Sequence, residues 1–182
     1  MHEPVPVTEI CPEFASPGAT PTPWEHARTR LAEAPLCWVT NVRPDGRPHA
    51  TPLLSVWVDG SVCFCTGPEE RKAVNLSKNP HCAMSTGDNS LEGGPDVIVE
   101  GTGAPVEDHA ELGRIADAYE RKYGASITSE DGTWFGLGDA VRKVSILTVR
   151  VTPAKAFAFN KAPVFSQTRY TFTRPRHMSA PG

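Results

Sequence analysis

Residues 36–66 of the chain read LCWVTNVRPDGRPHATPLLSVWVDGSVCFCT, and this stretch decides the fold class. Its opening residues follow the two-residue period of a β-strand. Pro44-Asp45-Gly46 predicts a turn into a second strand over residues 47–58. Asp59-Gly60 predicts a tight hairpin into a third strand over residues 61–66. The stretch therefore predicts a three-stranded antiparallel meander.

Three helices are expected around the strands. Thr22-Pro23-Trp24-Glu25 has the residue order of a helix start, with Thr22 as the N-cap, and predicts a helix that ends near Pro35. Pro68 opens a second helix, which Asn79-Pro80 stops. An apolar stripe predicts a third helix, closed by Gly124.

Three more strands bring the expected total to six. They cover residues 81–86, 96–106 and 144–152, and residues 155–159 extend the last one after Pro153. Gly101 and Gly103 in the fifth strand predict a bulge or a bend. Strands interleaved with helices over this length predict a small barrel with the helices packed outside.

One domain is expected, because the length of 182 residues suits a single core. Residues 1–21 carry five prolines and little periodicity, which predicts an extended arm that lies over a partner subunit. Residues 22–172 form the domain, and residues 173–182 form a flexible tail.

Charge and composition exclude several classes of function. The chain has 18 Lys+Arg against 21 Asp+Glu, scattered rather than clustered, so nucleic-acid or membrane-surface binding has no electrostatic support. No apolar stretch is long enough to span a bilayer, and the N-terminus lacks signal-peptide features, so we expect a cytoplasmic protein. Four of the five cysteines lie in apolar strand-like segments, as reduced core thiols do, so neither a disulfide scaffold nor a metal site is expected.

The segment from Thr66-Gly67 to Arg71-Lys72 is the most informative for chemistry. A strand ends there in a small-residue turn and enters a helix with two adjacent cations. The free N–H groups of the helix start and the positive charges would together bind a phosphate. The alternative is a solvated helix whose cations pair with Glu69 and Glu70. Spacing alone leaves both interpretations open.

The wider pattern resembles the pyridoxamine 5'-phosphate oxidase-like FMN-binding split barrels, over residues 22–172. It is most similar to their flavin/deazaflavin oxidoreductase branch, whose members bind FMN or the deazaflavin coenzyme F-420. The segments that carry the resemblance are Trp38 to Pro52, Val56 to Gly60, Val62 to Thr66, Arg71-Lys72, Asn75-Leu76 and Asn79-Pro80.

This resemblance implies a mostly β fold, a six-stranded antiparallel split β-barrel with flanking helices. It also implies a homodimer that holds two cofactors in grooves between the subunits. By position, Arg71 and Lys72 would hold the cofactor phosphate, with Thr66 and Gly67 beside it. The cofactor ring would lie along Thr51, Pro52, Leu53 and Leu54. FMN-using oxidases of the family carry a basic residue in the second strand. This chain has none between His49 and Val58, which favours a deazaflavin or a divergent FMN site.

Several other residues have open roles. His49 shares a strand face with Thr51 and would either face the cofactor or lie at a surface or interface. Trp57 is interpreted as a core or dimer-contact aromatic, with stacking on the cofactor as the alternative. Lys161, Gln167 and Arg169 would either contact an anion or form an edge segment whose arginine pairs with a carboxylate.

The leading hypothesis is an oxidoreductase that transfers hydride between FMN or F-420 and a small unsaturated molecule. No Ser-His-Asp order, Walker loop or HExxH motif is present, and hydride transfer needs none of these because the cofactor does the electron chemistry. No catalytic residue is assigned. The alternative is a non-catalytic flavin- or haem-binding carrier or sensor of the same fold.

Overall fold

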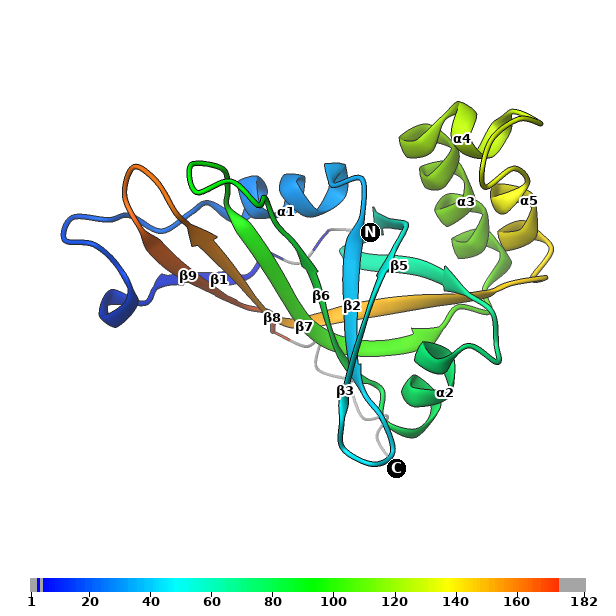
Figure 1. Ribbon diagram of the computed structural model, residues 1–182, viewed down its shortest axis with the longest axis horizontal. Helices are drawn as coiled ribbons and strands as arrows, with labels where there is room; N and C mark the ends of the chain where they lie inside the picture. The colour runs from blue at the N-terminus through cyan, green and yellow to red at the C-terminus, as the bar shows by residue number, and fades with distance from the viewer. Residues whose placement is uncertain (1–2, 4, 174–182) are drawn as a thin grey trace, which may run out of the picture.

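The computed structural model describes residues 3 and 5–173 as one connected antiparallel sheet with helices outside it (Figure 1). None of the described helices is long and apolar enough to cross a membrane. The strands are β1 (Val7–Ile10), β2 (Cys37–Val42), β3 (Pro48–Leu53), β4 (Ser55–Val58), β5 (Ser61–Thr66), β6 (His81–Thr86), β7 (Asp96–Pro105), β8 (Leu147–Asn160) and β9 (Ser166–Thr171). The helices are η1 (Pro12–Phe14), α1 (Trp24–Glu33), α2 (Arg71–Lys78), α3 (His109–Tyr123), α4 (Ala125–Thr128) and α5 (Leu137–Arg142).

The long strand β8 organises the barrel, because it pairs with β5 near its start and with β7 along most of its length. The ladders run without a break from β4 through β5, β8, β7, β6 and β2 to β3. A single residue, Leu54, connects β3 to β4. The barrel is therefore closed at this point by the chain itself and not by hydrogen bonds between the two strands. The predicted class, a mostly β split barrel with flanking helices, is confirmed.

The strand boundaries differ from the prediction in three places. The second expected strand is divided at Leu54 into β3 and β4. The last expected strand continues through Pro153, because the ladder skips one residue opposite the Glu100/Gly101 step. That bulge also confirms the prediction made from the glycines of β7. Two unpredicted strands, β1 and β9, pair with each other at the sheet edge.

The segments flanking the predicted domain are only partly described. Within residues 1–21, β1 pairs with β9 of the same chain, and the backbone N–H of Cys11 donates to the carbonyl of Gln167 at 2.8 Å. The expected tail over residues 173–182 lies outside the described residues after Thr173.

The predicted role of Thr22 as the N-cap of the first helix is wrong. Pro23 holds the N-cap position of α1, and no side chain caps it. Thr22 instead ties the helix start to the sheet: its N–H donates to Thr168 Oγ1 at 2.9 Å, and its carbonyl accepts from Tyr170 Oη at 2.7 Å. Its hydroxyl accepts from Asn160 Nδ2 at 2.9 Å. These long-range partners outcompete the local cap.

The other two predicted helices end at the expected positions. Residues 68–70 form a turn, so α2 begins at Arg71 rather than at Pro68. Asp108 caps α3 by accepting from the N–H of Glu111 at 2.7 Å. Gly124 closes α3 with a φ of +49°, a conformation that favours glycine.

Two apolar clusters hold the elements together. The first fills the barrel and includes Phe64, Met84 and Tyr170. The second lies between the outside of β4 and β5 and the helix α3, where Tyr119 is fully buried. The five cysteines are free, as expected, and all but Cys65 are buried.

Side chains of α3 also bond to the backbone where β3 passes into β4. Tyr119 Oη donates to the Leu54 carbonyl at 3.1 Å, and Lys122 Nζ donates to the Ser55 carbonyl at 2.8 Å. Tyr123 Oη accepts from the Ser55 N–H at 3.0 Å and lies 3.0 Å from the Ser55 carbonyl. These bonds supply partners that a strand ladder would otherwise provide.

The bulge gives a test of the fold. A Cβ at Gly101 would overlap the carbonyl oxygen of Thr152, which is backbone and cannot move aside. Gly101→Ala should therefore lower the free energy of unfolding by about 1–3 kcal/mol, measured by urea denaturation. Gly113→Ala is the control, because space around it is open inside α3 and alanine should stabilise the helix by about 0.5–1 kcal/mol. Equal stabilities of the two variants would contradict the bulge geometry.

Candidate functional site

The candidate site lies where α2 packs beside the ends of β2 and β3 (Figure 1). A buried hydrogen bond joins these elements: Asn75 Nδ2 of α2 donates to Asn41 Oδ1 of β2 at 2.7 Å. Both amides are almost completely buried. Because α2 is only eight residues long, this bond also fixes the position of its first turn beside the β2–β3 hairpin.

The predicted phosphate-binding residues lie together at the start of α2. Thr66 ends β5 and is buried, Gly67 begins the turn, and Arg71 and Lys72 form the first residues of the helix. Arg71 is exposed and forms no ion pair with any residue that the structure describes. An exposed arginine at a helix start is free to bind an anion.

Lys72 is 7% exposed, which is unusual for lysine unless the ammonium is paired. It donates to the carboxylate of Glu70. The other oxygen of that carboxylate, Oε1, accepts from the Gly67 N–H at 2.8 Å. The hydrogen bond from Lys72 and then the one from Gly67 lower the pKa of Glu70. The alternative of cations paired with neighbouring glutamates therefore holds for Lys72 and Glu70.

Buried polar atoms without a partner gather at the same place. Within the described part of the chain, seven buried side-chain nitrogen or oxygen atoms have no hydrogen-bond partner. Four of the seven belong to this site: Asn41 Nδ2, Asn75 Oδ1, His49 Nδ1 and Arg43 Nε. Turning over both amides of the asparagine pair would still leave one NH2 and one C=O without a partner. The site is therefore built with unused hydrogen-bonding capacity.

His49 belongs to this group through its place on β3. It lies directly opposite Asn41 in the β2–β3 register, and its Nε2 is 3.5 Å from Thr51 Oγ1. Burial lowers the pKa of His49 below the ordinary 6.5, and the charges of Arg43, Lys72 and Arg71 lower it further. The imidazole is therefore neutral at pH 7, beside three permanent cations.

The residues predicted to line a cofactor ring divide between two faces. Thr51 and Leu53 lie on the same face of β3 as His49, and Leu53 joins the barrel core. Pro52 is exposed on the opposite face, and Leu54 packs toward α3 at the strand break. Because successive side chains of a strand point to opposite faces, these four cannot all use side chains toward one ligand.

The remaining weighed residues make contacts elsewhere. Trp57 packs edge-on against Trp24 with ring centroids 5.8 Å apart, and its Nε1 donates to Glu3 Oε1 at 2.9 Å. Lys161 pairs with Asp96 across 3.1 Å. Arg169 pairs with Glu9 of β1 across 3.0 Å, as the edge-segment alternative predicted. Gln167, in β9, accepts through its backbone from Cys11.

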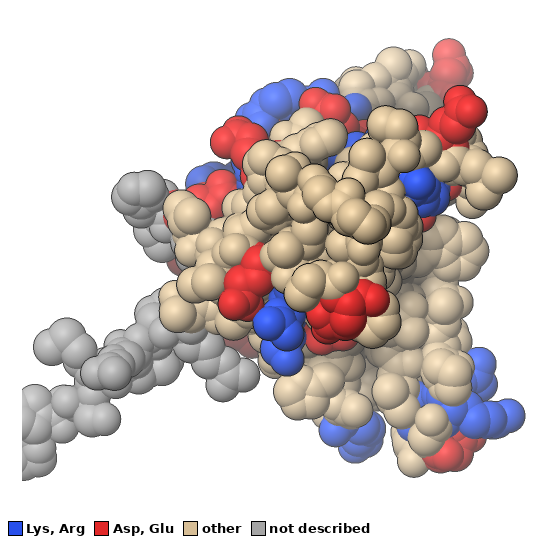
Figure 2. All heavy atoms as spheres, turned by 90° about the vertical axis from the view of Figure 1, so that its left-hand side faces the viewer, with Lys and Arg blue, Asp and Glu red and all other residues tan. Residues whose placement is uncertain are grey.

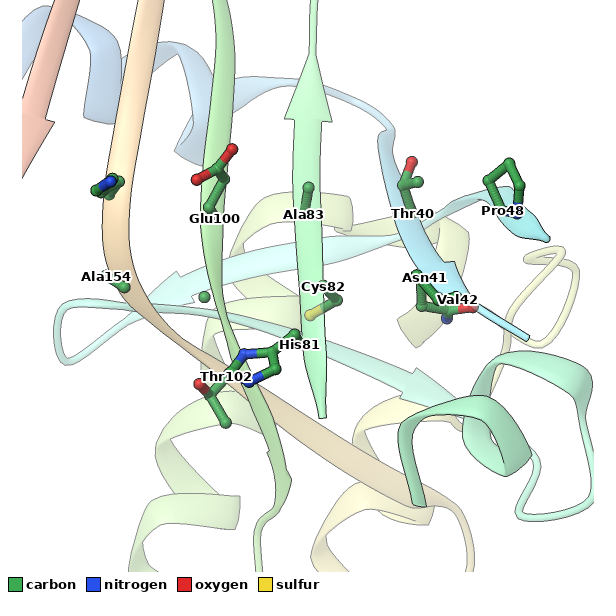
Figure 3. A pocket seen from close by; sticks show the side chains of 12 residues that line it. Thr40, Asn41, Val42, Pro48, His81, Cys82, Ala83, Glu100, Thr102 and Ala154 are labelled. Carbon is green, nitrogen blue, oxygen red and sulfur yellow. The ribbon is translucent and has the colours of Figure 1, made fainter. Parts of the chain in front are cut away.

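A hollow lies close to the bulge on the outer face of β2, β3, β6, β7 and β8, which is the open face of the sheet (Figure 3). Its volume is about 470 Å³. Sequence reasoning missed it, although the apolar residues Val42 and Pro48, which line it, are exposed on β2 and β3. The residues that line it are Thr40, Asn41, Val42, Pro48, His81, Cys82, Ala83, Glu100, Gly101, Thr102, Ala154 and Lys155.

Charged side chains do not form one basic patch on the face drawn in Figure 2. Acidic and basic groups are interspersed there around a broad uncharged area. This distribution agrees with the scattered cations of the sequence and gives no support for a nucleic-acid surface on that face.

The ladder order and the outer helices define a split β-barrel protein. The model of the pyridoxamine 5'-phosphate oxidase family matches residues 23–156. The chain therefore belongs to the pyridoxamine 5'-phosphate oxidase family, and the predicted resemblance is confirmed. No curated protein matches the chain in sequence.

Solved structures share the fold at low sequence identity. A conserved hypothetical protein of Mycobacterium tuberculosis has a TM-score of 0.60 and 22% identity, over 92% of this chain and 96% of its own. A heme-binding protein of Mycobacterium smegmatis has a TM-score of 0.60 and 17% identity, over 81% of this chain and 58% of its own. An F-420 reductase has a TM-score of 0.50 and 24% identity, over 69% of this chain and 92% of its own. These identities show a shared fold only.

The lowered pKa of His49 gives a testable pH dependence. As the pH falls through 6.5, the unfolded chain binds a proton at this histidine before the folded protein does. The free energy of unfolding should therefore fall with pH in this range, and His49→Gln should reduce that fall. Urea denaturation at pH 8 and pH 5.5 checks the difference. An identical pH dependence in parent and variant would show that His49 titrates as it does in the unfolded chain.

Proposed function

We propose that the protein is an oxidoreductase that binds a flavin-type cofactor, deazaflavin F-420 or FMN, with its phosphate at the start of α2. It transfers hydride between that cofactor and a small unsaturated organic substrate. The observation that supports this best is the group of four unpartnered buried polar atoms beside Arg71 and Lys72. Such a group is expected where a polar ligand supplies the missing hydrogen bonds.

The site residues fit a phosphate. Arg71 is free to donate two parallel bonds to phosphate oxygens, and the backbone N–H of Gly67 lies beside Thr66 at the start of the turn. Lys72 brings a second positive charge into a nearly buried position. The first-turn N–H groups of α2 add a partial positive charge.

The cofactor ring is proposed to lie along Thr51, Pro52, Leu53 and Leu54, and backbone groups give the physical basis. Among the described strands, β3 pairs only with β2, so its other edge keeps free N–H and C=O groups there. The pyrimidinedione edge of a flavin or deazaflavin carries complementary C=O and N–H groups. Hydrogen bonds from the ring to backbone groups do not require the side chains of these four residues to point to the same face.

When bound, the ring supplies the hydride chemistry. The chain's own residues bind the phosphate, orient the ring along β3 and exclude water from its covered face. No acid–base pair in the described residues stands out beside β3, and we assign no catalytic residue.

Deazaflavin F-420 is the favoured cofactor. No basic residue lies between His49 and Val58, where FMN-using oxidases of the family carry one. The similarity to an F-420 reductase points the same way. Parallel titrations with F-420 and FMN decide the question, and tenfold tighter binding of FMN, about 1.4 kcal/mol, would reverse the choice.

The alternative is a haem carrier, and two observations favour keeping it. One solved relative in fold is a heme-binding protein, and His81 lines the hollow on the open sheet face, where an axial ligand would be needed. The visible spectrum of the purified protein separates the two functions, because haem gives a Soret band and the flavin-type cofactors do not.

We further propose that the protein is a homodimer that pairs through the open face of the sheet. Trp38, near the start of β2, is 49% exposed on this face, and monomeric proteins rarely expose large contiguous apolar areas. A two-fold pair would bury the same surface of both copies. Outward-facing residues on it are Trp38, Val42, Ala50, Pro52, Ala83 and Ile98.

The dimer can be tested by placing a charge on this face. Trp38→Glu should convert the dimer to a monomer at micromolar concentration in sedimentation velocity, because an unpaired carboxylate would be buried at the interface. Leu91→Glu is the control, since Leu91 is 86% exposed in the loop between β6 and β7 and does not lie on a strand of this face. A parent that sediments as a monomer and still binds cofactor would refute the pairing.

The phosphate placement predicts the effect of removing each cation. Arg71→Ala and Lys72→Ala should each raise the cofactor dissociation constant by roughly tenfold to a hundredfold, because each loses a charge-assisted contact. Lys78→Ala removes a cation from the other end of α2 and should leave the affinity unchanged. Fluorescence titration measures all three. Parent-like affinity in both site variants would place the phosphate elsewhere.

A further inference from the structure

The proposed phosphate site already contains an anion that belongs to the chain itself. The carboxylate of Glu70 accepts from the Gly67 N–H at 2.8 Å and from the ammonium of Lys72. These are two of the donors that the proposed function assigns to the cofactor phosphate. An incoming phosphate must therefore share them with Glu70 or displace it.

The Glu70 side chain bonds to the turn and to Lys72, but not to the N–H groups of the helix that it precedes. Glu70 occupies the N-cap position of α2, but its side chain caps no N–H of the helix. The carboxylate turns back toward Gly67 instead, and half of the side chain is exposed. The first-turn N–H groups of α2 consequently remain available for a ligand.

We propose that Glu70 is a built-in competitor for the cofactor phosphate and makes the site prefer a singly charged phosphodiester over a doubly charged phosphomonoester. This inference rests on the proposed placement of the phosphate at α2. Glu70 is thus a specificity-determining residue, whereas Arg71 and Lys72 anchor either kind of phosphate.

The preference follows from Coulomb's law. At a given distance, a carboxylate repels a dianion with twice the energy with which it repels a monoanion. FMN carries a phosphomonoester whose second pKa is about 6, so it is close to a dianion at pH 7.5. F-420 carries its phosphate as a diester, which has one negative charge. Glu70 is ionised at pH 7.5, because the hydrogen bonds from Lys72 and Gly67 lower its pKa below the usual value.

The test compares Glu70→Gln with Glu69→Gln, and the probes are FMN, F-420 and riboflavin at pH 7.5. Glu69 is exposed, one residue away, and forms no ion pair within the described chain, so its variant removes the same formal charge without touching the donors. Glu70→Gln should tighten FMN binding about tenfold and F-420 binding about threefold, the square root of the first factor. Riboflavin has no phosphate, so its binding should not change.

A measurement at pH 5 separates charge from structure. The FMN phosphate then carries one charge, so the advantage of Glu70→Gln over the parent should fall to about threefold. Other titratable or charged groups facing the site are His49 on β3, Arg43 after β2, and Glu69, Arg71 and Lys72 around the start of α2. These groups are the same in the parent and in Glu70→Gln, so their effects largely cancel in the ratio of the two dissociation constants.

The outcomes are distinguishable from those of the proposed function. The inference is overturned if Glu70→Gln binds FMN no more tightly than Glu69→Gln, or if riboflavin gains as much as FMN. If Arg71→Ala weakens binding while Glu70→Gln changes nothing, the phosphate placement stands and only this inference falls. If the parent and Glu70→Gln bind neither coenzyme, both fall.

Discussion

The barrel depends on the hydrogen bonds from α3 to the backbone of Leu54 and Ser55, where β3 passes into β4. The chain leaves one ladder and enters another there, so the backbone loses the partners that a continuous sheet would give it. Tyr119, Lys122 and Tyr123 replace those partners. A buried backbone group left unpaired would cost about 1–3 kcal/mol, so α3 is a structural part of the barrel rather than a cover.

The same break creates the surfaces that the proposed function uses. Because β3 does not pair with β4, it keeps a free edge, and its inner face meets α2 through the β2–β3 hairpin. The proposed phosphate contacts on α2 and the proposed ring contacts on β3 are therefore brought together by the β2–β3 hairpin. The outer face of β2 and β3 stays open and apolar around Trp38, which suits a second copy of the chain.

Those parts of the fold that depend on neighbouring residues could be predicted from the sequence. The Asp59-Gly60 hairpin, the bulge near Gly101 and the helix end at Gly124 follow from backbone preferences of neighbouring residues, and the structure has all three. The division at Leu54 was not predictable, because the sequence remains apolar through it. Thr22 was misjudged because its partners Thr168 and Tyr170 are almost 150 residues away. The cations of α2 were found from the sequence, but the Asn41–Asn75 bond that positions them joins elements that no local pattern connects.

The unpartnered atoms beside α2 connect binding to stability. Each buried polar atom without a partner costs about 1–3 kcal/mol, and four of them together approach the whole stability of an ordinary domain, about 5–15 kcal/mol. A fold can carry such a cluster only if water or a ligand supplies the bonds. A ligand that binds the folded chain alone also stabilises it by mass action. The asparagine pair, His49 and Arg43 thus relate the local order of the site to the water or polar ligand that supplies their missing hydrogen bonds.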